Sequence, residues 1–111
     1  MAKGLREWQT WVVRSGGRLV GSVRGRAAVD DPQTWEVGRL MVAPDLQGRG
    51  IGRALLEFVE QSAAPTATRF WINTGTQSTA NLRRYRRAGY RVVPGEGRYP
   101  GTVDLTKPRR S

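Results

Sequence analysis

The chain has 111 residues, of which 19 are Lys or Arg and 9 are Asp or Glu, so its formal net charge is +10. This length suits one domain with one modest core, and a content of 38% hydrophobic and 25% charged residues is neither that of a membrane protein nor that of a disordered chain. Cysteine and histidine are absent, which excludes disulfides, thiolate zinc sites and any triad or base built on histidine.

The basic residues are nearly all arginines, with Lys3 and Lys107 as the two lysines. Two interpretations of this bias stay open: a GC-rich coding bias, or attraction to a polyanion such as nucleic acid, an acidic membrane surface or a nucleotide cofactor. The few scattered carboxylates predict no metal site. No apolar run approaches the ~20 residues of a membrane span, and no apolar segment follows Met1, so we expect a cytoplasmic protein.

Three strands are predicted in the first part of the chain. Residues 11–14 and 19–23 flank a Gly-Gly pair and predict a hairpin, whose second strand continues to Ala27. A third strand is predicted over Thr34–Val42, in which Glu36, Gly38, Leu40 and Val42 share one face if the alternation is regular. Gly38 in mid-strand suggests a bulge or a close approach by another group.

Helices and strands then alternate. An amphipathic helix is predicted from Gly50 until Pro65 stops it, and Gly89 is a natural C-cap residue for a second helix. The remaining elements are a strand over 68–73, the second helix over 80–88, and strands over 90–93 and 102–106. The predicted order is β-β-β-α-β-α-β-β in one domain, 1–111, with an N-terminal stub over 1–10 and a frayed tail over 107–111.

The segment Gln47–Arg53, QGRGIGR, lies between the third strand and the first helix. Its glycines let backbone amides approach a ligand closely, and a helix start adds unpaired amides and a partial positive charge. The segment therefore predicts a site for a pyrophosphate. It lacks the Lys-Ser/Thr of a P-loop and the spacing of a dinucleotide fingerprint. A glycine-rich connecting turn is the simpler alternative.

Two motifs resemble those of the GCN5-related N-acetyltransferase (GNAT) family. Its Gln/Arg-x-x-Gly-x-Gly/Ala signature is similar to Gln47, Gly50 and Gly52, and its Asn-x-x-x-Tyr-x-x-x-Gly-Tyr/Phe pattern is similar to NLRRYRRAGY at 81–90. The resemblance covers roughly residues 11–106. It implies an α/β (α+β) fold with a mixed, mostly antiparallel sheet and flanking helices. It also implies an N-acetyltransferase that moves an acetyl group from acetyl-coenzyme A directly to a primary amine.

The resemblance also implies roles for residues. The strand end would bind the pantetheine arm, the amides of the glycine-rich segment would hold the pyrophosphate, and Asn81 would reach the pantetheine. The implied cofactor-binding residues are Leu40, Met41, Val42, Gln47, Gly48, Arg49, Gly50, Ile51, Gly52, Arg53, Asn81 and Tyr85.

Tyr85 and Glu36 are the implied catalytic residues. The Tyr85 hydroxyl would protonate the leaving thiolate, and the backbone N–H of Val42 would polarise the thioester carbonyl; helical spacing alone would make Tyr85 a core aromatic. Glu36 would be the base, and the alternative is an exposed glutamate paired with Arg26 or Arg39. Trp35 could line the acceptor pocket, or belong to the core.

The chain departs from the family pattern at its start, where a strand and two helices usually come before the predicted hairpin. Three interpretations stay open: a minimal member of the family, a fragment of a longer chain, or a chain whose missing wall is supplied by a partner subunit. The open strand edge near Trp11 favours a homodimer. The arginines at 83, 84, 86 and 87 are either a solvated helix face or contacts to the 3′-phosphate or an acidic acceptor. The alternative function is a non-catalytic GNAT-like module that binds coenzyme A or nucleic acid.

Overall fold

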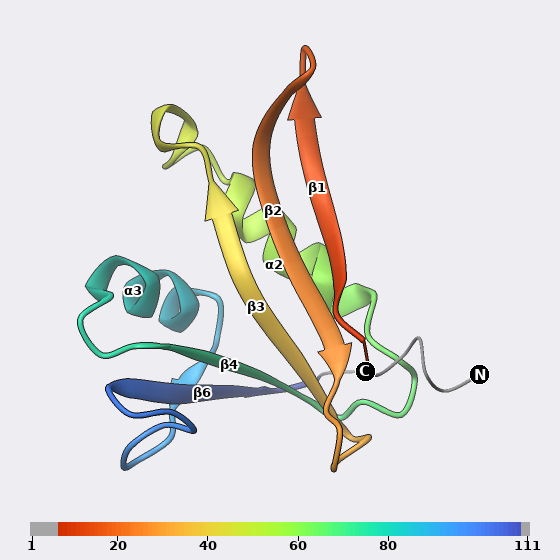
Figure 1. Ribbon diagram of the computed structural model, residues 1–111, viewed down its shortest axis with the longest axis vertical. Coiled ribbons are helices and arrows are strands. Elements are labelled where there is room, and N and C mark those ends of the chain that lie inside the picture. Colours follow the sequence, from red (N-terminus) through yellow and green to blue (C-terminus); the bar gives the residue numbers. More distant parts are fainter. Residues whose placement is uncertain (1–6, 110–111) are drawn as a thin grey trace.

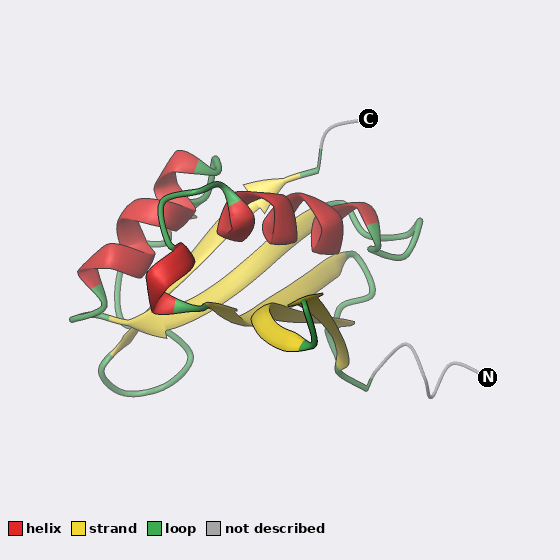
Figure 2. Ribbon diagram, turned by 90° about the horizontal axis from the view of Figure 1, so that it is seen from above, coloured by secondary structure: helices red, strands yellow, loops and turns green. Residues whose placement is uncertain are grey.

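Within residues 7–109, which the computed structural model describes, two α-helices lie over one face of a six-stranded sheet (Figures 1 and 2). The elements follow the predicted order, with one added turn of 3-10 helix, so the predicted fold class is confirmed. In chain order they are β1 (Gln9–Ser15), β2 (Arg18–Ala27), β3 (Thr34–Val42), η1 (Pro44–Leu46), α2 (Ile51–Gln61), β4 (Arg69–Gly75), α3 (Thr79–Arg87), β5 (Arg91–Val92) and β6 (Thr102–Pro108).

The sheet opens between its two central strands. Its strand order is β1-β2-β3-β4-β6-β5, and β3 and β4 form its parallel pair. That pairing is short, from Thr34 opposite Arg69 to Val37 opposite Ile72. Beyond it β3 continues beside β2 while β4 continues beside β6, and the two strands diverge (Figure 1). The β4-facing edge of residues 38–42 therefore has no neighbour among the described strands.

Helix α2 packs its apolar face on β2 and β3. Leu55, Leu56 and Val59 are buried and join Trp35 in one hydrophobic core. Gly25 on β2 permits this close packing, because a Cβ there would stand 2.6 Å from Trp35 Nε1 and 2.8 Å from a Val59 methyl group. The helix thereby fixes where the strand-to-helix loop leaves β3.

A β-bulge interrupts β3 just before the opening. Arg24 on β2 pairs with Gly38, but Ser22, two residues earlier, pairs with Met41, three residues later. One extra residue of β3 is thus accommodated at this place, and Arg39 has a positive φ of 51°. The bulge suggested by Gly38 is confirmed.

The bulge changes which side chains share a face. Val42 lies in the core with Trp35 and Val37, whereas Glu36 points to the opposite face, where Arg26 contacts it. The regular alternation that placed Glu36, Leu40 and Val42 together was wrong, because one inserted residue reverses the parity of everything after it.

The C-terminal segment is better ordered than predicted. Strand β6 includes Lys107, whose ammonium group bonds Glu60 at 2.9 Å. The backbone N–H of Arg109 donates to Thr68 O at 2.8 Å, and the Arg109 guanidinium donates to the carbonyl of Ala64 at 2.8 Å. The frayed tail was therefore wrong for residues 107–109, because these bonds hold them; the last two residues lie outside the described part.

Of the predicted N-terminal stub, residues 1–6 lie outside the described residues, and Gln9 begins β1. Strand β1 is an edge of the sheet, and Val12 on it is 50% exposed; the homodimer through this edge stays a prediction.

Across residues 7–109, no helix combines the length and apolar character that crossing a membrane requires.

Candidate functional site

The loop from β3 to α2 is shaped by two glycines. Gly48 and Gly50 have φ values of +82° and +83°, a region that other residues avoid. A Cβ added at either glycine would meet no atom within 4 Å, so both face open space. The backbone conformation therefore favours glycine at both positions. Because no side chain covers the backbone there, it borders an open space that a ligand can enter.

The loop leads into the exposed start of α2. Gly50 is the N-cap residue, and no side chain caps the helix. The first amides of an α-helix have no acceptor within the helix, so those of Ile51, Gly52 and Arg53 need an external partner. Together with the partial positive charge of the helix start, they form a site suited to an anion.

A groove of about 400 Å³ joins this helix start to α3. From α3, Arg83, Arg84 and Arg87 line it, and a Cβ built at Gly52 would stand 3.5 Å from the Arg84 side chain. Arginines therefore face the uncapped amides across the groove. Seven of the predicted cofactor-binding residues line it, namely Val42, Gln47, Gly48, Gly50, Ile51, Gly52 and Arg53, whereas Leu40, Met41, Arg49, Asn81 and Tyr85 do not.

The open edge of β3 meets this groove at Val42. The N–H of Ala43 donates to Val20 O on β2 at 2.9 Å. Because successive residues of a strand direct their backbone groups to opposite sides, the N–H and C=O of Val42 point toward the opening. The Gln47 amide donates to that carbonyl at 3.3 Å, so Gln47 fastens the loop to the strand end and leaves the Val42 N–H available.

Tyr85 lies on the inner face of α3 and is 5% exposed. Its ring packs edge-on against Tyr90 at a centroid distance of 6.2 Å. Gly89, with φ of +100°, ends the helix as predicted, and the Tyr90 N–H then returns to Tyr85 O at 3.0 Å. The Tyr85 hydroxyl has no hydrogen-bond partner within residues 7–109, and burial raises its pKa above the ordinary value. Tyr85 therefore keeps its proton at neutral pH.

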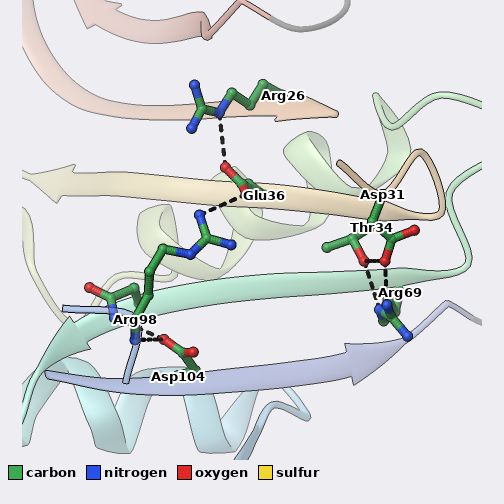
Figure 3. A network of polar contacts seen from close by, with 8 residues as sticks. Arg26, Asp31, Thr34, Glu36, Arg69, Arg98 and Asp104 are labelled. Atoms are coloured by element: carbon green, nitrogen blue, oxygen red, sulfur yellow. Dashed lines mark hydrogen bonds and ion pairs between the residues drawn. The ribbon is translucent and has the colours of Figure 1, made fainter. Parts of the chain in front are cut away.

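Glu36 is buried at 2% exposure and is held by two arginines (Figure 3). Arg26 Nε donates to one carboxylate oxygen at 2.8 Å, and an Arg98 terminal nitrogen donates to the other at 3.0 Å. The alternative interpretation of Glu36 as an exposed residue was therefore wrong. Its predicted pairing with Arg26 is confirmed, and its second partner is Arg98 and not Arg39. The structure leaves the role as base a prediction.

A second, smaller cavity of about 160 Å³ surrounds Glu36 on the face opposite α2. Trp35 does not line it, because it points into the core; Trp71 lines it instead. Sequence reasoning missed most of its residues, although the alternating Arg24 and Arg26 of β2 were a signal. The lining residues are Trp8, Arg24, Arg26, Glu36, Val37, Gly38, Arg39, Trp71, Asn73, Arg98 and Tyr99.

Comparisons with known proteins identify the family of the chain. The model of the acetyltransferase (GNAT) family matches residues 2–90. The chain is 37% identical over 87 residues to N-alpha-acetyltransferase RimI of Mycobacterium tuberculosis, covering 78% of this chain and 54% of that protein. It spans about half or less of the length of the curated relatives it matches.

Two solved structures share the fold. The PaiA N-acetyltransferase of Thermoplasma acidophilum, in complex with coenzyme A, aligns with a TM-score of 0.80 at 16% identity, over 97% of this chain and 65% of that one. A GNAT family acetyltransferase of Elizabethkingia anophelis with acetyl-CoA bound aligns with a TM-score of 0.74 at 23% identity, over 92% and 76%. The chain belongs to the GNAT acetyltransferase family.

Proposed function

We propose that this member of the GNAT family is an acetyl-CoA-dependent N-acetyltransferase that transfers an acetyl group directly to a primary amine. The observation that carries the proposal is the continuity between the open edge of β3 and the groove at the start of α2. The groove supplies uncapped amides and arginines for phosphates, and the strand edge supplies backbone groups for an extended, amide-containing arm.

The residues of the groove fit the phosphates of coenzyme A. The space at Gly48 and Gly50 admits a group against the backbone, and the pyrophosphate would accept from the first amides of α2. Arg84 lies over this helix start and would add a charge-assisted bond. The PaiA and Elizabethkingia neighbours, which are described with coenzyme A or acetyl-CoA bound, support this assignment by fold.

Acetyl-CoA supplies an activated acetyl thioester. During transfer a C–N bond forms and the C–S bond breaks, while one proton leaves the amine and one must reach the sulfur. The Val42 N–H points into the opening, where it would polarise the carbonyl oxygen. Tyr85 would protonate the sulfur, because its raised pKa keeps the hydroxyl protonated. Asn81, one helical turn earlier on the same face, would contact the pantetheine.

Glu36 is the proposed base. Both oxygens of Glu36 already accept from guanidinium groups, so its first task in this proposal is to hold Arg26 and Arg98 in place. Each oxygen has a further lone pair that can accept a hydrogen bond from a water molecule. In this proposal such a water molecule takes the proton from the amine and passes one to the carboxylate. Glu36→Gln separates these two roles.

The test is a calorimetric titration with acetyl-CoA at physiological salt, with ATP as the polyanion control, followed by an assay of free thiol release with primary amines. Saturable micromolar binding of acetyl-CoA without comparable ATP binding, and thiol release that depends on an amine, are expected. Equal weak binding of both ligands would refute the cofactor assignment and favour a charge-driven binding module.

Two arginines of α3 provide a matched pair of variants for the same titration. Arg84→Gln should weaken acetyl-CoA binding about tenfold, because one charge-assisted hydrogen bond contributes about 1.5 kcal/mol. Arg86→Gln removes the same charge from the same helix outside the groove and should leave the affinity within about twofold. An equal loss in both variants would mean that only net charge matters.

A further inference from the structure

The cavity around Glu36 carries more positive charge than its own carboxylates neutralise. Four arginines line it, together with one glutamate. Glu36 accepts from Arg26 and Arg98 and so uses both of its oxygens. Asp104, nearby on β6, accepts from the Arg98 backbone N–H at 3.2 Å and from the Asn73 amide at 2.9 Å (Figure 3). Within residues 7–109, neither acid forms a hydrogen bond or ion pair with Arg24 or Arg39.

Of the four arginines in this cavity, Arg24 and Arg39 form no side-chain hydrogen bond within residues 7–109, and Arg24 is the more buried of the two. Its Nε is fully buried and has no hydrogen-bond partner within residues 7–109. Burial and the neighbouring charges of Arg39 and Arg26 lower its pKa. A buried donor without an acceptor is costly, and three adjacent guanidinium groups repel one another. An anion bound beside the Arg24 guanidinium would offset this repulsion.

Two tryptophan rings pack against three of these four guanidinium groups. The Trp8 ring lies 4.0 Å from the Arg24 guanidinium and 4.3 Å from that of Arg26, and the Trp71 ring lies 4.0 Å from that of Arg98. Stacking of this kind restricts the rotation of a guanidinium. A planar donor group at a fixed angle matches the planar carboxylate better than a spherical anion.

The cavity adjoins the reaction path of the proposed function. Gly38 and Arg39 line it, and they are the first residues of β3 beyond the parallel pairing with β4. Its volume of about 160 Å³ is below the 300–1,000 Å³ of drug-sized pockets. It therefore suits a small acceptor, or the end of a larger one.

We propose that this arginine pocket binds a carboxylate of the acceptor, so that the substrate class is a primary amine with a carboxylate a few bonds away. Arg24 and Arg39 are the binding residues, and Glu36 with Trp8 and Trp71 are the positioning residues. The proposal rests on the proposed acetyl transfer. The carboxylate could come from a free amino acid or from an acidic side chain next to a peptide N-terminus, and the assay below distinguishes these sources.

The experiment compares amines that differ only in the carboxylate. Thiol release from acetyl-CoA is measured with each L-amino acid and with its carboxamide, and with peptide amides that carry Asp or Asn at the second position. The best carboxylate-bearing amine should have a KM at least tenfold below that of its amide partner. Equal KM values, or a preference for the uncharged partners, would overturn the proposal while leaving acetyl transfer intact.

The variants assign the preference to the pocket. Arg24→Gln should reduce the preference to below threefold and leave the acetyl-CoA Kd unchanged. Arg14→Gln, an exposed arginine on β1 outside the cavity, is the control for net charge and should keep the preference. Loss of the preference in both variants would contradict a role for Arg24 in particular.

A binding measurement keeps the proposal testable if no amine is turned over. The indole N–H signals of Trp8 and Trp71 are followed by NMR while millimolar pools of amino acids or of their carboxamides are added. The carboxylate pool should shift these two signals, and the amide pool should not. The absence of a difference would overturn the proposal even if acetyl-CoA binds, whereas a difference without turnover would refute only the proposed transfer.

Discussion

Replacing Glu36 with glutamine tests whether the buried carboxylate holds the second cavity together. Glu36 is 2% exposed and accepts one hydrogen bond from Arg26 and one from Arg98. The amide is isosteric, but it removes the negative charge and turns one acceptor into a donor that faces a guanidinium. Arg26 and Arg98 would then remain beside Arg24 without a countercharge.

The expected loss of stability follows from the two bonds. A hydrogen bond to a charged group contributes about 1.5–3 kcal/mol, and this range applies to Arg26, whose side chain is 23% exposed. The Arg98 side chain is 39% exposed, so solvent screening reduces its share to about 0–1 kcal/mol. Together they give a loss of about 1.5–4 kcal/mol, which for a domain of this size lowers Tm by about 6–16 °C.

Urea unfolding followed by tryptophan fluorescence measures this loss, because Trp71 lies in the same cavity. Glu57→Gln is the matched control, since Glu57 forms an exposed ion pair with Arg53 on α2 and should cost at most about 0.5 kcal/mol. If Glu36→Gln were no more destabilising than the control, the carboxylate would not be holding the arginines. If the variant folds, its pH–rate profile separates the two roles. Loss of the fall in kcat at acidic pH would identify Glu36 as the base. A raised KM for the acceptor with an unchanged acidic side of the profile would instead identify Glu36 as a positioning residue.

Three further changes test the rest of the site and fold. Tyr85→Phe should lower kcat about 10²–10⁴-fold if the hydroxyl is the proton donor, with unchanged acetyl-CoA affinity by calorimetry; unchanged turnover would make Tyr85 a core residue only. Gly50→Ala should weaken acetyl-CoA binding, whereas Gly17→Ala, at a φ of +80° and also facing open space, should carry the same backbone strain without that effect. Hydrogen bonds from Thr34 and a backbone N–H lower the pKa of Asp31, and Arg69 adds to the shift. In urea unfolding, Asp31→Asn should therefore be less stable than the native chain above about pH 4, and the difference should narrow as the pH falls further. A difference that does not narrow between about pH 4 and pH 2 would contradict this.

The cofactor half of the site could be predicted from the sequence because its signals are local. Gly48 and Gly50 stand where the backbone needs a positive φ, and the helix that begins at Ile51 repeats its apolar residues every three or four positions. Strand β3 has the predicted bounds, Thr34–Val42. Each of these features depends on residues only a few positions apart, so the local amino-acid sequence is enough to predict it.

The cavity around Glu36, the proposed acceptor site, depends on contacts between distant segments. Arg98 reaches Glu36 across 62 positions of sequence, from a loop with no regular pattern, and Trp8 stands under Arg24 from a segment that precedes the first strand. The bulge at Arg39 matters most, because it removes Glu36 from the face of Val42. A β-bulge cannot be recognised from the length or composition of a strand, although it exchanges the two faces of the strand beyond it.

That exchange has a functional consequence. With regular alternation, Glu36 and the Val42 side chain would share one face of the sheet, and the core would contain a carboxylate. The bulge allows Trp35 and Val42 to pack under α2, while Glu36 organises arginines on the other face. It also falls where β3 and β4 part. The bulge, which the sequence pattern did not predict in its effect on the faces, therefore lets one strand contribute to the hydrophobic core, to the groove proposed for the cofactor and to the arginine pocket proposed for the acceptor.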